Sequence, residues 1–247
     1  MKVSIITVTY NSARFLQDCI DSVHDQEYEE IEHIIVDGNS TDNTVEIIKT
    51  NIKKISKFIS EPDSGIYEAI NKGIKMATGE IVGILNSDDI FTDKGVVRRI
   101  AEGFTNGSQI VFANIDFISS KTGKIVRHYS SKGFSPWMFR FGFMPAHPTF
   151  YTYRRNFEKY GLYRIDMKIS GDFELLLRYL NKYKLSYKFI DDTWVNMLTG
   201  GVSTSGFKSI ILLNREIKQA CKSNGVYTNS LFIYSKYLIK WKSFIVK

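Results

Sequence analysis

The sequence has few cysteines and no long apolar run, and these two absences limit the kind of protein that it encodes. Its two cysteines, Cys19 and Cys221, lie far apart, so they predict neither a disulfide framework nor a cysteine metal site. No run approaches the roughly 18 apolar residues of a membrane-spanning helix. The N-terminus lacks the basic and apolar blocks of a signal peptide. We therefore expect a reducing, cytoplasmic location.

Two common phosphate-binding loops are also missing. No Gly-x-Gly-x-x-Gly follows the first apolar run, where Thr9-Tyr10-Asn11-Ser12 stands instead. A dinucleotide held by a bare helix N-terminus is therefore not expected. The chain also has no Gly-Lys-Thr or Gly-Lys-Ser loop of a P-loop enzyme. A bound diphosphate would have to be neutralised by a metal ion instead.

The charge of the chain points to anionic partners. The 247 residues carry a net charge of +7, which suits nucleotide phosphates, anionic lipid or nucleic acid. The excess lies largely in residues 208–247, which hold many lysines and very few acids. Because no recognised nucleic-acid-binding motif accompanies these lysines, we do not expect nucleic acid as a partner.

The first hundred residues alternate short apolar runs with helical patterns. Strands are predicted at residues 3–8, 31–36, 57–60 and 80–85, with helices between them. This order predicts an α/β fold with a mostly parallel central sheet and helices on both faces. Further strands are predicted at residues 110–112 and 116–119, with a hairpin leading into 125–129. The chain thus divides into a nucleotide-binding half (1–108), an acceptor-binding and catalytic half of the same domain (109–207) and a basic helical segment (208–247).

Four acidic residues stand where these strand patterns end or a loop begins: Asp37, Asp63, Asp88 and Asp89. The carboxyl ends of parallel strands share one edge of a sheet, so we expect these side chains to converge there. Acids are also common at helix caps, but Thr92 or Asp93 would cap the helix that follows. The adjacent pair at 88–89 would repel unless a cation, a shared proton or a basic side chain compensates, and a divalent metal carrying a phosphate is the simplest of these.

The same blocks resemble a known family. Residues 3–11, 35–42, 61–67, 71–73 and 85–89 are similar, in order, to motifs of the family 2 inverting glycosyltransferases, which have the GT-A fold. The bacterial enzymes that build O-antigen and capsule repeat units are the most similar group. The resemblance implies transfer of a sugar from a nucleotide-diphosphate donor, UDP by default, to a glycan or lipid-linked acceptor.

The resemblance also assigns roles in the nucleotide-binding half. It implies that Thr7, Thr9 and Tyr10 line the nucleotide pocket, that Asp37 contacts the base and that Asp63 lies near the base and ribose. For the two threonines, ordinary strand propensity is the alternative.

The acidic pair has its own assignment. Asp88 and Asp89 match the metal and diphosphate motif for Mn²⁺ or Mg²⁺, with Asp89 preferred as the direct ligand.

The second half must supply a base for the acceptor hydroxyl. Asp172 resembles the catalytic acid of the family, whereas its alternative role is that of a helix cap or first-turn acid. His147 lies between Pro145 and Pro148, which we expect to hold it extended and facing the substrate, although a lone histidine is more often structural. Gly200 and Gly201 resemble the glycine-rich substrate loop of relatives, or form an ordinary turn.

The C-terminal segment 230–247 predicts an amphipathic helix, and two interpretations stay open. Lys236, Lys240 and Lys247 fall on one side, with three apolar residues on another, Leu238, Trp241 and Ile245. Such a helix can lie on an anionic membrane, which would place the protein at the inner face of the plasma membrane. Alternatively, it packs on the domain with its lysines in solvent.

Two rival functions also remain. A nucleotidyltransferase would need a glycine-rich, basic nucleotide loop that this N-terminus lacks. A homologue that binds nucleotide sugars without turnover would not need Asp88, Asp89 and Asp172 together.

Overall fold

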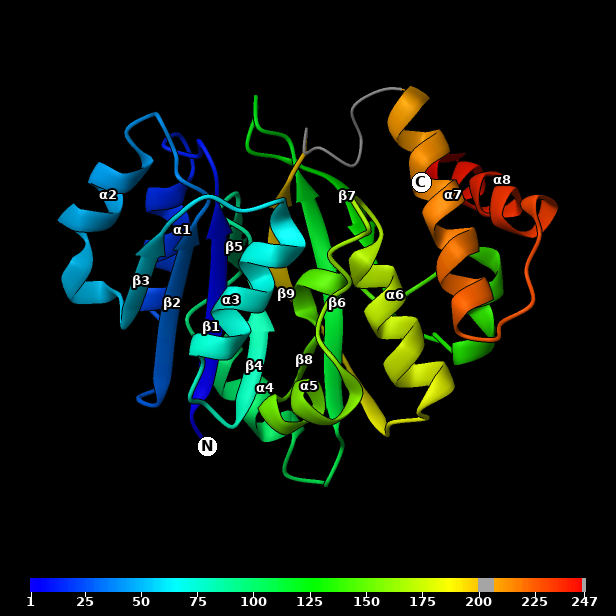
Figure 1. Ribbon diagram of the computed structural model, residues 1–247, viewed down its shortest axis with the longest axis horizontal. Coiled ribbons are helices and arrows are strands. Elements are labelled where there is room, and N and C mark those ends of the chain that lie inside the picture. Colours follow the sequence, from blue (N-terminus) through cyan, green and yellow to red (C-terminus); the bar gives the residue numbers. More distant parts are fainter. Residues whose placement is uncertain (200–206, 246–247) are drawn as a thin grey trace.

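One sheet of nine strands forms the centre of the described structure, and the two C-terminal helices lie beyond it at one side (Figure 1). The computed structural model describes the backbone of residues 1–199 and 207–245 and the side chains of residues 1–199 and 208–237. The strands of this part are β1 (Val3–Thr9), β2 (Ile31–Asp37), β3 (Lys57–Ser60), β4 (Ile81–Ile84), β5 (Asp89–Phe91), β6 (Ile110–Ile118), β7 (Ile125–Tyr129), β8 (Tyr151–Tyr153) and β9 (Tyr187–Leu198). They lie in the order β3-β2-β1-β4-β8-β6-β9-β5, and β7 pairs with β6.

Helices cover both faces of this sheet. The α-helices are α1 (Leu16–His24), α2 (Thr44–Thr50), α3 (Ile66–Met76), α4 (Val96–Gly103), α5 (Arg154–Tyr160), α6 (Gly171–Leu177), α7 (Phe207–Ser223) and α8 (Ser230–Ile245). Shorter turns are η1 (Ile52–Lys54), η2 (Pro136–Phe141), η3 (His147–Thr149) and η4 (Arg178–Lys182). Among the described residues, no helix combines the length and apolarity needed to cross a bilayer.

The sequence of β1 explains why the sheet is covered twice. All seven of its residues are buried, and successive side chains point to opposite faces. Ile6 and Val8 join the cluster formed with α3 and α6, whereas Val3 and Ile5 join the cluster formed with α1 and α4. A strand that is apolar on both faces must lie between two layers of helices.

The predicted α/β fold is confirmed, and the structure refines its sheet. β1, β2, β3 and β4 are parallel, as expected. Beyond β4 the sheet is mixed, since β8 is antiparallel to β4 and β6, and β7 is antiparallel to β6. The two strands expected at 110–119 form the single strand β6, and β5 was not predicted. β5 has three residues, too few for a periodic pattern to identify.

The C-terminal helices pack on the domain. α8 contacts η2 and α7, and Ile233 of α8 is buried with Ile217 and Cys221 of α7. Lys236 is only 3% exposed and lies against Gly142 and the ring of Tyr237. Both interpretations of this helix expected Lys236 to be accessible, in solvent or at a membrane, and this is wrong because its side chain faces η2. The side chains of Lys240, Lys247, Leu238, Trp241 and Ile245 lie outside the described part.

Candidate functional site

Hydrogen bonds join the loops that follow β1 and β2. The Asn11 N–H donates to Ser40 Oγ (2.8 Å), and Asn11 Oδ1 accepts the Thr41 N–H (2.9 Å). Asn11 and Asn39 both have positive φ, at 50° and 65°, a conformation that asparagine tolerates better than most residues. The asparagines therefore allow these two loops to turn back over the sheet edge and meet.

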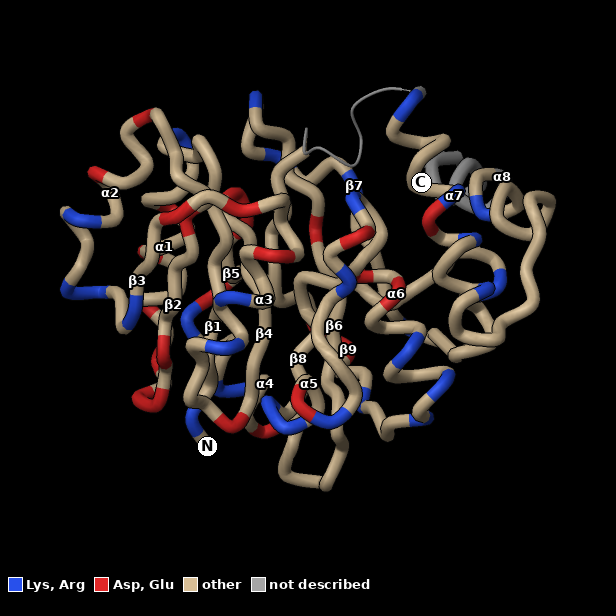
Figure 2. The backbone as a smooth tube through the Cα atoms, in the orientation of Figure 1, with Lys and Arg blue, Asp and Glu red and all other residues tan. Residues whose placement is uncertain are grey.

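The loops after β3 and β4 join the same edge. Ser60, the last residue of β3, donates to Asp37 Oδ2 (2.6 Å), and the Ser87 hydroxyl donates to Ser12 Oγ (3.0 Å). Segments that are up to 75 residues apart in sequence are thus in direct contact. The predicted convergence of the first four strand ends is present, and Figure 2 shows acidic residues along this edge beside β2 and α3.

Asp37, Asp63 and Tyr10 occupy one part of this edge. Asp37 is completely buried and accepts hydrogen bonds from the Ser40 N–H (3.0 Å), the Ser40 hydroxyl and the Ser60 hydroxyl. A Cβ on Gly38 would stand 2.7 Å from Asp63 Oδ2 and 3.5 Å from the Tyr10 ring. Asp63 and Tyr10 therefore flank Gly38, where only glycine leaves room for them, and the Tyr10 side chain is 63% exposed.

The two threonines of β1 lie deeper than the predicted pocket. Thr7 is completely buried, and its hydroxyl is 3.0 Å from His33 Nε2 and 3.7 Å from Cys19 Sγ. The prediction that Thr7 lines the nucleotide pocket is therefore wrong, because α1 and β2 cover it. Thr9 is buried too, but its hydroxyl lies at the strand end without a hydrogen-bond partner, so it stays a candidate.

Asp88 and Asp89 have different environments. Asp89 opens β5 and is completely buried, with Oδ2 accepting the Asn86 amide (3.2 Å) and Oδ1 without a partner. Burial raises the pKa of the Asp89 carboxyl well above its usual value, and the charge of Asp88 raises it further. Burial also raises the pKa of Asp88, which is only half-buried. Of the two, Asp88 is the carboxylate that a ligand can reach from the edge.

This pair can contribute to a cation site but does not complete one. No group of three His, Cys, Asp or Glu side chains suited to a metal occurs among residues 1–199 and 207–237. Hard divalent cations take oxygen ligands, and Mg²⁺ is commonly held by one or two carboxylates together with phosphates and water. Asp88 and Asp89 fit a cation of that kind if a phosphate supplies further ligands, and the unpartnered Oδ1 of Asp89 shows that the buried carboxyl lacks a compensating donor.

A second acidic centre lies at the start of α6. Asp172 Oδ2 is 3.2 Å from His147 Nδ1, and Oδ1 accepts the Phe173 N–H (2.8 Å) and the Tyr67 hydroxyl (3.4 Å). The side chains of Asp172 and His147 are 16% and 33% exposed, so both are reachable from solvent. The structure thus brings together two residues that the sequence proposed separately. Tyr67 was missed, because no local pattern shows a contact 105 residues away.

This second centre adjoins the first through two elements. Tyr67 lies in the first turn of α3, directly after the loop that holds Asp63. η3, which begins at His147, contacts β4, the strand that leads to Asn86 and Asp89. The expected extended backbone at His147 is wrong, since a 3-10 turn starts there. Gly200 and Gly201 fall outside the described residues. The residue before them, Thr199, lies two positions after Met197, which pairs with Asp89 across β9 and β5.

Comparison with known proteins identifies the family. The sequence model of glycosyl transferase family 2 matches residues 4–169, about two thirds of the chain. This chain belongs to glycosyl transferase family 2. The resemblance drawn from the strand-end motifs is therefore confirmed.

Relatives with curated descriptions match part of the chain. A Mycobacterium tuberculosis protein described as an uncharacterised glycosyltransferase is 38% identical over 104 residues, 42% of this chain and 40% of its own length. A glycosyltransferase of Nostoc is 35% identical over 138 residues, 54% of this chain and 42% of its own. A Mycobacterium bovis protein described as a PGL/p-HBAD biosynthesis glycosyltransferase is 32% identical over 117 residues, 45% of this chain and 46% of its own. Each match spans less than half of the relative.

Solved structures confirm the GT-A fold. Residues 1–349 of TarS from S. aureus, in complex with UDP-GlcNAc, superpose with a TM-score of 0.71 over 92% of this chain and 68% of that one, at 19% identity. The mannosyltransferase PcManGT from Pyrobaculum calidifontis, in complex with GDP-Man and Mn²⁺, gives a TM-score of 0.67 over 90% and 63%, at 16% identity.

We predict that Asp89→Asn stabilises the metal-free protein at pH 7. A raised pKa means that the protonated carboxyl favours folding and that this contribution is lost as pH rises through the folded-state pKa. The charge of Asp89 therefore costs stability at neutral pH, whereas an amide has no charge to bury. We therefore expect the free energy of unfolding of the variant to be higher than that of the wild type at pH 7.

Denaturant unfolding in a chelator, repeated at several pH values, measures this effect. The advantage of the variant should shrink as pH falls and the wild-type carboxyl takes up its proton. Asp18→Asn, at an exposed position of α1, makes the same change of charge and should have little effect. A stability loss in Asp89→Asn at pH 7 would contradict the prediction.

Proposed function

We propose that this protein is a metal-dependent inverting glycosyltransferase. It moves a sugar from a nucleotide-diphosphate donor, UDP by default, to a hydroxyl of a glycan or lipid-linked acceptor in bacterial surface polysaccharide synthesis of the O-antigen or capsule type. One observation carries the proposal: Tyr67 links Asp172 to the start of α3, so a solvent-accessible carboxylate adjoins the edge where four strand ends meet. Family membership supports it, as do the fold neighbours that bind UDP-GlcNAc and GDP-Man.

The donor would lie along the strand-end edge. Tyr10 offers an exposed ring beside Gly38, where a base can stack, and Asp63 stands next to it for the base and ribose. The carboxylate of Asp37 already accepts three hydrogen bonds, so its contact with the base would use its remaining acceptor capacity. Asp88 and Asp89 lie at the end of β4, where the diphosphate would follow.

The acidic pair would hold the cation. We assign the direct contact to Asp88, since Asp89 is completely buried, and we assign Asp89 to support from behind. This assignment reverses the order of preference that the resemblance suggested. A bound Mn²⁺ or Mg²⁺ would neutralise the diphosphate as it leaves.

Asp172 would act as the base. It accepts the proton of the acceptor hydroxyl while the hydroxyl oxygen forms a bond to the anomeric carbon and the bond from that carbon to the diphosphate breaks. Attack from the side opposite the leaving group inverts the anomeric centre. Tyr67 and His147 contact the two oxygens of Asp172 and would hold its orientation, and His147 is open to the acceptor.

An exposed aromatic patch supports a membrane-bound acceptor. The patch consists of Trp137 and Phe141 of η2, Tyr227, and Leu231 and Phe232 of α8. The distances between ring centroids are 5.5 Å for Trp137 and Phe141, 4.9 Å for Phe141 and Phe232, and 6.2 Å for Phe232 and Tyr227. Trp137, Tyr227 and Leu231 are more than half exposed. Trp and Tyr favour the membrane interface.

The charge of the C-terminal segment fits the same partner. Residues 208–247 hold eight of the 33 basic residues of the chain but one of its 26 acids, so they account for the whole net charge of +7. We propose that the patch, together with the basic residues of this segment other than the buried Lys236, places the enzyme on the anionic inner face of the plasma membrane.

Asp172→Asn should abolish transfer and preserve donor binding. The amide keeps the shape of the side chain but cannot accept a proton, and loss of a general base costs about 10²- to 10⁴-fold in rate. A panel of nucleotide sugars assayed for transfer and donor hydrolysis, with UDP affinity from calorimetry, measures both effects. Full turnover in the variant would rule out Asp172 as the base, and absence of turnover across the panel in wild type would favour a non-catalytic homologue.

Asp88→Asn should remove the effect of metal on nucleotide binding. In wild type, Mn²⁺ should increase UDP affinity at least about tenfold, because the cation bridges carboxylate and diphosphate. In the variant, calorimetric titrations with and without Mn²⁺ should give similar affinities. Asp18→Asn serves as the matched control and should behave like wild type. An unchanged response to Mn²⁺ in Asp88→Asn would overturn the metal assignment.

Replacing Trp137 and Leu231 together by Ser should weaken membrane binding at least about tenfold, because two apolar side chains no longer enter the interface. Co-sedimentation with vesicles of phosphatidylcholine and phosphatidylglycerol measures it. Ile52→Ser, at an exposed position in η1, is the control. Wild-type binding should also fall as salt screens the lysines. Equal sedimentation with neutral and anionic vesicles would contradict the charge argument.

A further inference from the structure

Glu216 of α7 holds the backbone directly before the start of α6. Its Oε1 accepts the Lys168 N–H (2.8 Å), and its Oε2 accepts the N–H groups of Ile169 (2.9 Å) and Ser170 (2.8 Å). Glu216 is only 5% exposed, so these charge-assisted bonds are shielded from water. One carboxylate from a distant helix thus fixes three consecutive peptide groups.

The same stretch is held from the other side by α3. The Tyr67 hydroxyl donates to the Ile169 carbonyl (2.7 Å) and lies 3.4 Å from Asp172 Oδ1. A Cβ on Gly171 would stand 2.7 Å from the Tyr67 ring, so the chain passes directly over that ring. Glu216 therefore binds the N–H of Ile169 and Tyr67 binds its carbonyl, so the backbone of this residue is held on both sides, three residues before the proposed base.

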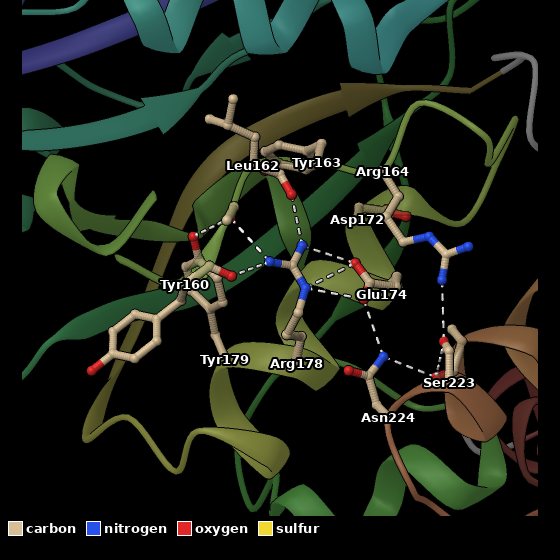
Figure 3. Close-up of polar contacts among 12 residues, drawn as sticks. Tyr160, Leu162, Tyr163, Arg164, Asp172, Glu174, Arg178, Tyr179, Ser223 and Asn224 are labelled. Atoms are coloured by element: carbon tan, nitrogen blue, oxygen red, sulfur yellow. Dashed lines mark hydrogen bonds and ion pairs between the residues drawn. The ribbon is translucent and has the colours of Figure 1, made fainter. Parts of the chain in front are cut away.

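α7 contacts α6 a second time, one turn further along. Asn224, just after α7, donates to Glu174 Oε1 (3.1 Å), and Glu174 pairs with Arg178 (2.9 Å). Arg178 in turn donates to the carbonyls of Tyr160, Gly161 and Leu162, as Figure 3 shows in part. These contacts hold α6 through the buried side chains of Glu174 and Arg178, whereas Glu216 holds the backbone directly before its first turn.

We propose that Glu216 is a positioning residue for the transfer reaction, acting through the backbone of residues 168–170 to orient Asp172 against Tyr67 and His147. The inference rests on the proposed role of Asp172. α7 begins 38 residues beyond the last residue matched by the family model, at residue 169, so the helix that orients the base lies outside the matched region. Glu216 touches no substrate in this proposal and performs no proton transfer.

Glu216→Gln tests the proposal, because the amide has the same shape but offers one acceptor oxygen and places N–H donors against backbone N–H groups. We expect kcat to fall about 10- to 100-fold, in line with a small misplacement of a reacting group. KM for the donor and calorimetric UDP affinity should stay within about twofold. Hydrogen exchange of the backbone amides of residues 168–170 should become faster, while exchange within α7 should be unchanged.

Two controls separate positioning from general loss of stability. Ile217→Val removes one buried methyl group from the next residue of α7 and leaves the carboxylate in place. Glu158→Gln makes the same chemical change at an exposed position of α5. Both should keep kcat near wild type, even where Ile217→Val lowers the melting temperature as much as Glu216→Gln does.

The assay uses whichever of UDP-N-acetylglucosamine, UDP-glucose and GDP-mannose gives the highest turnover. Unchanged kcat in Glu216→Gln, an equal loss in Ile217→Val, or a parallel loss of UDP affinity would overturn the proposal. If Asp172→Asn is inactive while Glu216→Gln keeps full activity, only the positioning role fails. If Asp172→Asn keeps full activity, or if no donor turns over, the proposed function fails and the positioning role with it.

Discussion

The burial of an acidic side chain beside a second acid is the constraint on which the rest of the site depends. Asp89 is completely enclosed, receives one weak hydrogen bond from Asn86 and has one oxygen without a partner. An uncompensated buried charge costs several kcal/mol, which a folded protein of ordinary stability can rarely tolerate without a purpose. A cation arriving with a phosphate would remove this cost, so the proposed metal binding would couple ligand binding to local stability at the end of β4.

The two acidic centres differ in the number of donors around them. Asp172 accepts hydrogen bonds from the Phe173 N–H and the Tyr67 hydroxyl and lies beside His147, so its anion is well solvated by the protein. Asp89 has the Asn86 amide alone among the described donors. Such a contrast suits a division of labour in which one centre attracts positive charge and the other remains free to take a proton.

Much of the first half of this arrangement follows from local sequence. Apolar runs of four to seven residues separated by helical patterns specify parallel strands, and parallel strands place their ends together, so Asp37, Asp63 and Asp88 could be assigned to one edge. The apolar pattern does not show which polar side chains of a strand are covered by a helix and which reach the surface. Thr7 and Thr9 share one face of β1, and only the position of α1 shows that Thr7 is covered.

The second half is harder to predict, because its contacts join distant segments. No periodicity indicates that Tyr67 meets Asp172, that Glu216 meets residues 168–170, or that Lys236 turns inward against Gly142. The prolines near His147 suggested an extended chain, yet the backbone forms a 3-10 turn, which Pro148 accommodates because its missing N–H is not needed in a first turn. These contacts depend on how helices pack, which is decided by tertiary structure.

Different contacts hold the strand-end edge and Asp172 in place. The donor edge is held by short polar contacts among loops of the first 90 residues, such as those between Ser12 and Ser87. The proposed base, Asp172, is held by α3 on one side and by α7 on the other, and α7 is itself anchored by apolar packing of Ile217 and Cys221 against Ile233 and Phe139. Hydrogen bonds such as those from Tyr67 to Asp172 and from Asn71 to Tyr163 join the two sets of contacts, yet the strand-end edge is held by its own loops. A change in the C-terminal helices would therefore act on the proposed base before it reached the proposed nucleotide site. In a GT-A enzyme, this separation gives a physical route by which one donor site can serve different acceptors.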